Sequence, residues 1–251
     1  MKTKALRLLL TLVGVSLLLC GCAAPALKVE NGVYSHPKTD VSYVRAPLCY
    51  EAVAIVESEA VARLKQGGDD VILYAIRDTD TARMIASANY EIFYAQGDRL
   101  PELWEMDANR VQITQTGSIN YAIAVIENGA DVQALVELYH NGVWFSEDEI
   151  DENLKPVRYD LKFSSPHYPA FYYVLTYRRY TSDVLVYEDI DDPNSFTPTY
   201  SGVEVTVKEY NDGSGYYAEY NFGRELLYHR ESGRCYAVGD TVAKYLINSA
   251  E

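Results

Sequence analysis

The sequence has little positive charge and no apolar run long enough to cross a membrane. Its 251 residues carry 22 Lys and Arg against 36 Asp and Glu, a net charge of −14. Such an acidic surface repels nucleic acid and anionic lipid, and no basic stripe or nucleic-acid motif offsets it. The apolar run at the start, Leu8–Leu19, has 12 residues, and a transmembrane helix needs roughly 20. We therefore expect neither a nucleic-acid partner nor a membrane-spanning helix.

Familiar catalytic motifs are also missing. The four histidines lack metal-ligand spacing such as H-E-x-x-H, and no G-x-S-x-G turn or glycine-rich phosphate loop is present. Ser35-His36-Pro37-Lys38 matches S-x-x-K by letter only, because Pro37 belongs to an expected hairpin and no K-T-G follows. We expect no cofactor and favour a non-catalytic protein. Whether the chain is an enzyme stays open, since two carboxylates acting on a glycosidic bond leave no local motif.

A dense group of oxygen ligands occurs at Asp189, Asp191 and Asp192, followed by Asn194. Calcium binds about six to eight oxygen atoms, so these aspartates are weak candidates for a metal site. Pro193 stands at the fifth position of an EF-hand loop, however, and no glycine stands at the sixth. We interpret the segment as a solvated acidic turn and expect no metal.

The most informative segment that is present is the N-terminus. Three basic residues among the first seven precede Leu8–Leu19, the pattern of a secretory signal. The next residues complete Leu19-Cys20-Gly21-Cys22, which resembles a bacterial lipobox: an aliphatic residue, two small positions, then cysteine. Cys20 departs from the pattern, because Ala or Ser is commoner there. The resemblance covers residues 1–22, and no domain family is recognised beyond it. An ordinary secretory signal, cut near Gly21 or Ala23, is the alternative.

The resemblance implies a bacterial lipoprotein precursor. Residues 1–21 would be removed, and the sulfur of Cys22 would carry a diacylglyceryl group, usually with a further acyl chain on the new amine. Two or more acyl chains anchor a protein stably, so we expect an extracytoplasmic protein tied to a bacterial membrane. The signal holds three of the 22 basic residues and no acidic one, so the mature charge is −17. We expect residues 22–31 to form a tether, with a reach of at most roughly 35 Å.

Only two cysteines remain after cleavage and acylation, Cys49 and Cys235. In an oxidising compartment a distant pair can form a disulfide. Two buried thiols are the alternative, and the sequence does not choose between them.

We assign the chain to the α+β class, with residues 32–251 forming one domain or two subdomains that divide near 145–156, where acidic residues cluster. Two similar segments begin at Ala52 and Ala122, each an apolar run followed by an acid, a cap residue and a helical pattern. They predict helices near 58–66 and 130–140, either by duplication of a strand–helix unit or by chance. The composition predicts strands at 71–76, 90–95 and 110–114.

The C-terminal half has a clearer pattern. Segments rich in β-branched and aromatic residues are separated by turn residues, which predicts an antiparallel meander. A short amphipathic helix is expected after Asp240. The predicted strands are 159–163, 171–177, 184–188, 203–210, 216–222, 225–229 and 234–238.

Tyrosine is unusually abundant, with 23 in the chain. Its flat, amphipathic ring suits recognition surfaces, and Tyr216 and Tyr220 share one strand face with Tyr217 on the other. Alternatively, tyrosine simply suits strands, where its ring is buried and its hydroxyl is wet. The leading hypothesis is a cell-surface lipoprotein with a non-catalytic domain that binds an envelope or extracellular partner, either cell-wall glycan or protein. A surface-tethered hydrolase of polysaccharide or peptide, and an accessory subunit of a membrane complex, are the alternatives.

Overall fold

The computed structural model describes residues 24–115, 121–147, 155–181, 204–209, 216–221 and 225–247. The chain divides into two compact units. Unit 1 comprises Met1–Ala46 with Ala52–Arg99, and unit 2 comprises Pro47–Glu51 with Leu100–Glu251. The division that we expected near 145–156 therefore falls inside unit 2.

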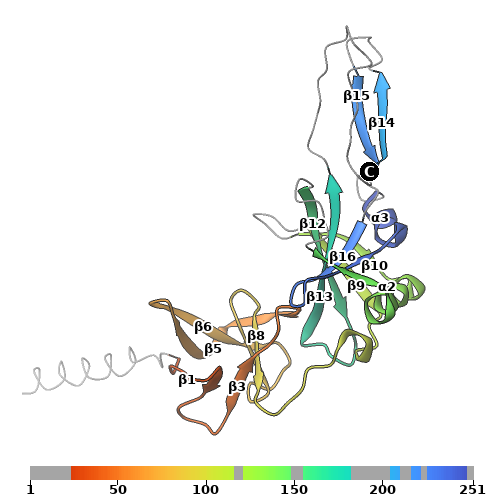
Figure 1. Ribbon diagram of the computed structural model, residues 1–251. Coiled ribbons are helices and arrows are strands. Elements are labelled where there is room, and N and C mark those ends of the chain that lie inside the picture. Colours follow the sequence, from red (N-terminus) through yellow and green to blue (C-terminus); the bar gives the residue numbers. More distant parts are fainter. Residues whose placement is uncertain are drawn as a thin grey trace, which may run out of the picture. The chain divides into compact units, whose positions relative to one another are not determined.

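Unit 1 is a seven-stranded antiparallel sheet in the order β1-β2-β3-β8-β7-β6-β5 (Figure 1). Residues just before β1 also pair with β5, since Ala26 forms a parallel bridge with Arg63. This bridge joins the two ends of the strand order, so the sheet closes into a small barrel. The strands are β1 Lys28–Glu30, β2 Val33–Ser35, β3 Ser42–Arg45, β5 Ile55–Gln66, β6 Asp69–Ile76, β7 Met84–Ser87 and β8 Ile92–Ala95.

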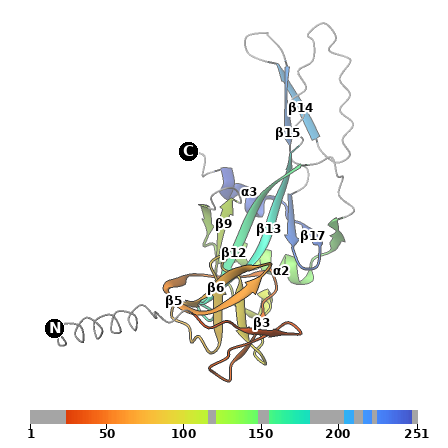
Figure 2. The same ribbon diagram turned by 90° about the vertical axis from the view of Figure 1, so that its left-hand side faces the viewer.

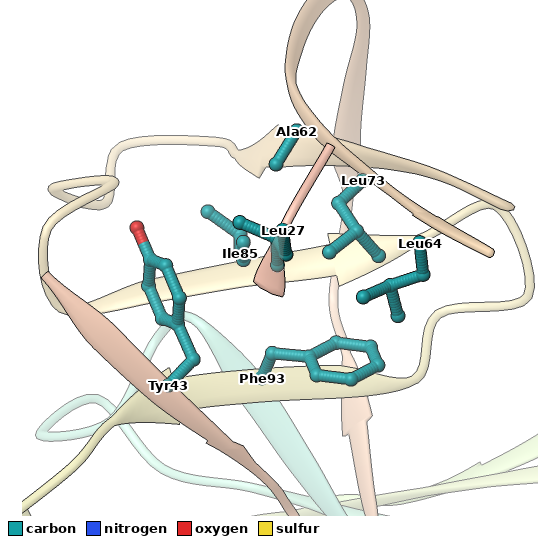
Figure 3. Packing of buried hydrophobic residues seen from close by; sticks show 7 residues of the cluster. All are labelled: Leu27, Tyr43, Ala62, Leu64, Leu73, Ile85 and Phe93. Atoms are coloured by element: carbon teal, nitrogen blue, oxygen red, sulfur yellow. The ribbon is translucent and has the colours of Figure 1, made fainter. Parts of the chain in front are cut away.

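The interior of this barrel is a cluster of seven buried side chains (Figure 3). In β5 the inward Ala62 and Leu64 alternate with more exposed residues, as a strand with one wet face requires. In β7 and β8 the neighbouring Ala86 and Ile92 are buried as well. The hydroxyl of buried Tyr43 donates to the carbonyl oxygen of Thr81 at 2.7 Å, so the core contains no unsatisfied group at that position. The cluster consists of Leu27, Tyr43, Ala62, Leu64, Leu73, Ile85 and Phe93.

The helix predicted at 58–66 is wrong, because these residues lie in β5. Ala62 and Leu64 are buried while Val61, Arg63 and Lys65 are more exposed, which is the alternation of a strand. Most of these residues have good helix propensity, but pairing with the N-terminal segment on one side and β6 on the other decides the conformation. The duplication of a strand–helix unit is also excluded, because the first of the two segments contains no helix.

Unit 2 contains a second sheet, in the order β10-β9-β12-β13-β16-β17-β11, with β4 also paired to β13. Its long strands β12 and β13 run side by side in both views (Figures 1 and 2). A separate hairpin is formed by β14 Glu204–Glu209 and β15 Tyr216–Asn221. The sheet strands are β4 Tyr50–Ala52, β9 Arg110–Gln115, β10 Tyr121–Ile126, β11 Trp144–Ser146, β12 Lys155–Ser164, β13 Phe171–Thr181, β16 Glu225–His229 and β17 Arg234–Ala237.

The helices of unit 2 are α2 Gly129–Asn141, α3 Asp240–Ile247 and the 3-10 turn η1 Leu103–Glu105. The side chain of Asn128 accepts the Ala130 N–H at 3.0 Å and so caps α2, which confirms the helix predicted at 130–140. Asp131 of α2 accepts hydrogen bonds from Tyr245, at 2.6 Å, and Lys244, at 2.7 Å. These bonds join α2 to the C-terminal helix, which the sequence also predicted.

The antiparallel meander predicted for the C-terminal half is confirmed for β12, β13, β16 and β17, whereas β14 and β15 pair only with each other. The predicted strand at 184–188 lies outside the described residues. Because unit 1 contains only strands among its described residues, the protein is richer in β-structure than the α+β assignment suggested. Among the described residues, no helix combines the length and apolar character needed to cross a membrane.

Leu73→Ala tests the barrel core. Leu73 is fully buried in the cluster, so the substitution should lower the free energy of unfolding by about 2–5 kcal/mol. Leu48→Ala is the matched control, because Leu48 is 54% exposed and its loss should cost less than about 0.5 kcal/mol. Urea denaturation of both variants provides the measurement. Equal losses would contradict the packing described here.

Candidate functional site

Most of the site residues predicted from the sequence lie outside the described residues or have side chains whose exposure is not described. Tyr216, Tyr217 and Tyr220 belong to β15, whose backbone pairs with β14, but the exposure of their rings falls outside what is described. Cys22 also lies outside the described residues. The same holds for the weak metal candidates Asp189, Asp191 and Asp192. Elsewhere, in the parts of the chain that are described, no three His, Cys, Asp or Glu side chains gather as metal ligands would.

The tyrosines whose burial is described divide between the interior and the surface: six are buried, and most of the others are half-buried. Only Tyr90 and Tyr121, 40% and 53% exposed, count as exposed. Packing in the interior, the alternative that the sequence left open, therefore accounts for these six tyrosines. The fully or nearly fully buried ones are Tyr43, Tyr50, Tyr139, Tyr173, Tyr177 and Tyr236.

Hydrogen-bonded rings between α2 and the sheet form the centre of unit 2. The hydroxyls of Tyr139 and Tyr173 lie 2.7 Å apart, and the Tyr173 hydroxyl lies 3.4 Å from Nε2 of His229. Burial raises the pKa of both tyrosines, so both are neutral at physiological pH. The Ser232 N–H donates to Nδ1 of His229, which makes Nδ1 an acceptor and places the ring proton on Nε2, facing Tyr173.

The Ser232 hydroxyl also lies 2.8 Å from Nδ1 of His229. This contact is local, because a turn brings the two residues together: the Gly233 N–H donates to the His229 carbonyl at 3.0 Å. Burial lowers the pKa of His229, which weakens it as a base. The pair is therefore explained by turn geometry and provides no evidence for nucleophilic catalysis.

Both tryptophans of the chain lie near the C-terminal end of α2. Trp104 of η1 is 42% exposed, and its ring centroid lies 4.4 Å from that of His140. Trp144 of β11 is 50% exposed, with the Arg234 guanidinium 4.6 Å from its ring centroid. We call these four residues the tryptophan surface.

One buried ring links the two halves of the tryptophan surface. Tyr139 lies 5.9 Å from Trp104 and 5.7 Å from Tyr236, measured between ring centroids. Tyr236 is in turn the ladder partner of Trp144. The two indoles are thus held on a common packed base, and each has one polar or cationic neighbour while much of its surface remains open.

The sequence analysis missed the tryptophan surface because it considered tyrosine, which is abundant, and not tryptophan, which is rare. A usable signal was present: Val143 and Trp144 directly follow Gly142, where α2 ends. Val143 lies between the helix end and the three-residue strand β11, and Trp144 is the first residue of that strand, so both have little interior to enter. Val143 is 91% exposed.

The face of the unit 2 sheet that points away from α2 carries ion pairs. Asp160 is buried and accepts hydrogen bonds from Arg230 at 2.6 Å and Thr176 at 3.3 Å. On the same face Arg178 pairs with Glu147. Burial raises the pKa of Glu147, but the hydrogen bond from Arg178 and its charge more than offset this, so the pKa lies below its usual range. A general acid needs the opposite shift.

The structure does not join Cys49 to Cys235. Both are buried, and neither is in a disulfide. Cys49 contacts Tyr173 on the α2 side of the sheet. Tyr236 also faces α2, and adjacent strand residues point to opposite faces, so Cys235 points away from that side. Burial raises the pKa of Cys49 to about 11, which keeps it a thiol.

Thiol counting tests this arrangement. A chain that starts at Ala23 contains only Cys49 and Cys235. Because both are buried, the native protein should react slowly with Ellman's reagent, and the protein unfolded in guanidinium without reductant should release two equivalents. Native mass spectrometry before and after alkylation is an independent check. Zero equivalents after unfolding would show that the disulfide forms.

His229 should make stability pH-dependent. Its folded pKa lies below the ordinary 6.5, so the unfolded chain takes up the proton first as the pH falls. Stability from this residue is therefore present above about pH 6.5 and is lost as the pH falls towards the folded pKa. Urea midpoints at pH 7.5 and 5.5 should differ less in His229→Phe than in the parent. His140→Phe, at an exposed histidine, should leave the difference unchanged. An identical pH dependence in all three proteins would contradict the assignment.

Comparison with known proteins adds no relative. No family model, no curated protein and no solved structure matches this chain. The interpretation of the tryptophan surface therefore rests on the residues themselves.

Proposed function

We propose that this chain is a lipid-anchored protein of a bacterial envelope, and that unit 2 binds a glycan through the tryptophan surface without catalysis. The observation that carries the proposal is the position of Trp104 and Trp144. The chain has only two tryptophans, and both are about half exposed. Trp104 contacts Tyr139 of α2, and Trp144 is the ladder partner of Tyr236, which contacts the same tyrosine.

The proposed location in the cell envelope rests on the N-terminal sequence. A basic start, a 12-residue apolar run and Leu19-Cys20-Gly21-Cys22 together resemble a lipoprotein signal. Acyl chains on Cys22 would attach a protein whose net negative charge is repelled by an anionic membrane.

The make-up of the tryptophan surface suits a sugar. Each indole lies beside a group that hydrogen-bonds, His140 or Arg234. A pyranose needs this mixture, because its C–H face stacks on a flat ring while its hydroxyls need donors and acceptors at the rim.

Intrinsic fluorescence provides the test. Soluble cell-wall glycan fragments, titrated into the chain that starts at Ala23, should change the tryptophan emission saturably. Trp104→Ala and Trp144→Ala should each weaken binding about tenfold, equivalent to about 1.4 kcal/mol. The remaining tryptophan still reports binding in each variant.

Tyr121→Ala is the matched control, since Tyr121 is an exposed aromatic residue of the same unit and lies outside the tryptophan surface. It should bind as the parent does. If both tryptophan variants retain full affinity, the tryptophan surface is not the binding site. If no glycan fragment changes the emission while an envelope protein does so through these residues, the ligand class is wrong.

A further inference from the structure

We propose that the anchor at Cys22 holds one identified end of the unit 1 barrel against the lipid headgroups. The inference rests on the proposed acylation of Cys22. It concerns an interaction surface, and its partner is the bilayer itself.

The chain between the anchor and the barrel is much shorter than the sequence suggested. We expected residues 22–31 to be a tether, but the Arg63 N–H donates to the Pro25 carbonyl, and the Leu27 N–H donates to the Arg63 carbonyl, both at 2.9 Å. β1 then begins at Lys28. Only residues 22–24 remain as a link, with a reach of about 10 Å in place of roughly 35 Å.

Strand directions identify which end of the barrel lies beside this link. In an antiparallel pair the start of one strand lies beside the end of the next, and Lys28 at the start of β1 faces Ser35 at the end of β2. The same rule, applied around the sheet, brings three loops to the end where the chain enters the barrel. These loops are residues 36–41, 77–83 and 96–99.

Side-chain contacts agree with this grouping. Arg83 of the second loop pairs with Asp98 of the third at 3.3 Å. Tyr43, just after the first loop, donates its hydroxyl to Thr81 of the second. We call the three loops the entry loops.

The entry loops carry no net charge, in a chain whose net charge is −14. Each loop balances its acids with equal numbers of basic residues. The link reaches about 10 Å, which is close to the Debye length of about 8 Å. The headgroups would therefore be close enough to interact with the charges of the entry loops. The charged residues of the loops are Lys38, Asp40, Arg77, Asp78, Asp80, Arg83, Asp98 and Arg99.

Depth-dependent fluorescence quenching tests the orientation. The acylated full-length protein is placed in phosphatidylcholine–phosphatidylglycerol vesicles that carry a headgroup quencher. A fluorophore is attached at Thr39→Cys in an entry loop or at Asn89→Cys in the loop between β7 and β8, at the opposite end of the barrel. Cys49 and Cys235 are buried and Cys22 is acylated, so only the new cysteine takes the label. The label at 39 should be quenched at least about twofold more than the label at 89, because residue 39 lies at the end of the barrel where the short link enters and residue 89 lies at the other end.

A linker insertion provides the second arm. About 12 Gly and Ser residues placed between Ala24 and Pro25 add about 20 Å of mean reach, so quenching at 39 should fall to the level at 89. Equal quenching at both sites, or quenching unaffected by the linker, overturns the proposed orientation. Vesicle sedimentation reads out the anchor separately: a protein that does not sediment with vesicles overturns the acylation, and this inference with it.

Discussion

The pairing of Pro25 and Leu27 with Arg63 is the interaction on which the organisation of unit 1 depends. Without it, β1 and β5 would be the two exposed edges of an open sheet, with unpaired backbone groups that invite association. With it, the sheet closes around Leu27, Leu64 and the rest of the core. The same two hydrogen bonds fix where the N-terminal chain leaves the barrel, so one local contact sets both the stability of the unit and the geometry of an anchor at Cys22.

In unit 2 the corresponding constraint is the packing of α2 on the sheet through Tyr139. This ring meets Tyr173, His229 and Tyr236 inside the protein and Trp104 at its edge. A surface residue held by a buried, hydrogen-bonded ring loses little further freedom when a ligand binds, which favours recognition. The tryptophan surface is therefore an extension of the core and not an isolated exposed patch.

What the sequence predicted correctly was local. Asn128 and a helical apolar pattern predict α2, and segments rich in β-branched and aromatic residues between turns predict β12, β13, β16 and β17. β5 was mispredicted because its conformation depends on partners far away in the sequence, while Ala62, Arg63 and Leu64 taken alone favour a helix. The positions of Trp104 and Trp144 beside one end of α2 were beyond reach for the same reason, since only the folded ladder from Trp144 to Tyr236 and the ring contacts of Tyr139 bring them there.

Tyrosine and tryptophan thus occupy different places in the structure, and the composition alone does not show this. A tyrosine in a strand can bury its ring and still satisfy its hydroxyl, as Tyr43 and Tyr50 do with carbonyl oxygens of Thr81 and Pro101. Many tyrosines can therefore enter a β-rich core at little cost in unsatisfied polar groups. A large indole at the end of a helix or in a three-residue edge strand has no such interior position, and it stays half exposed. The half-exposed tryptophans, and not the buried tyrosines, are therefore the aromatic residues on which we base the proposed glycan-binding surface.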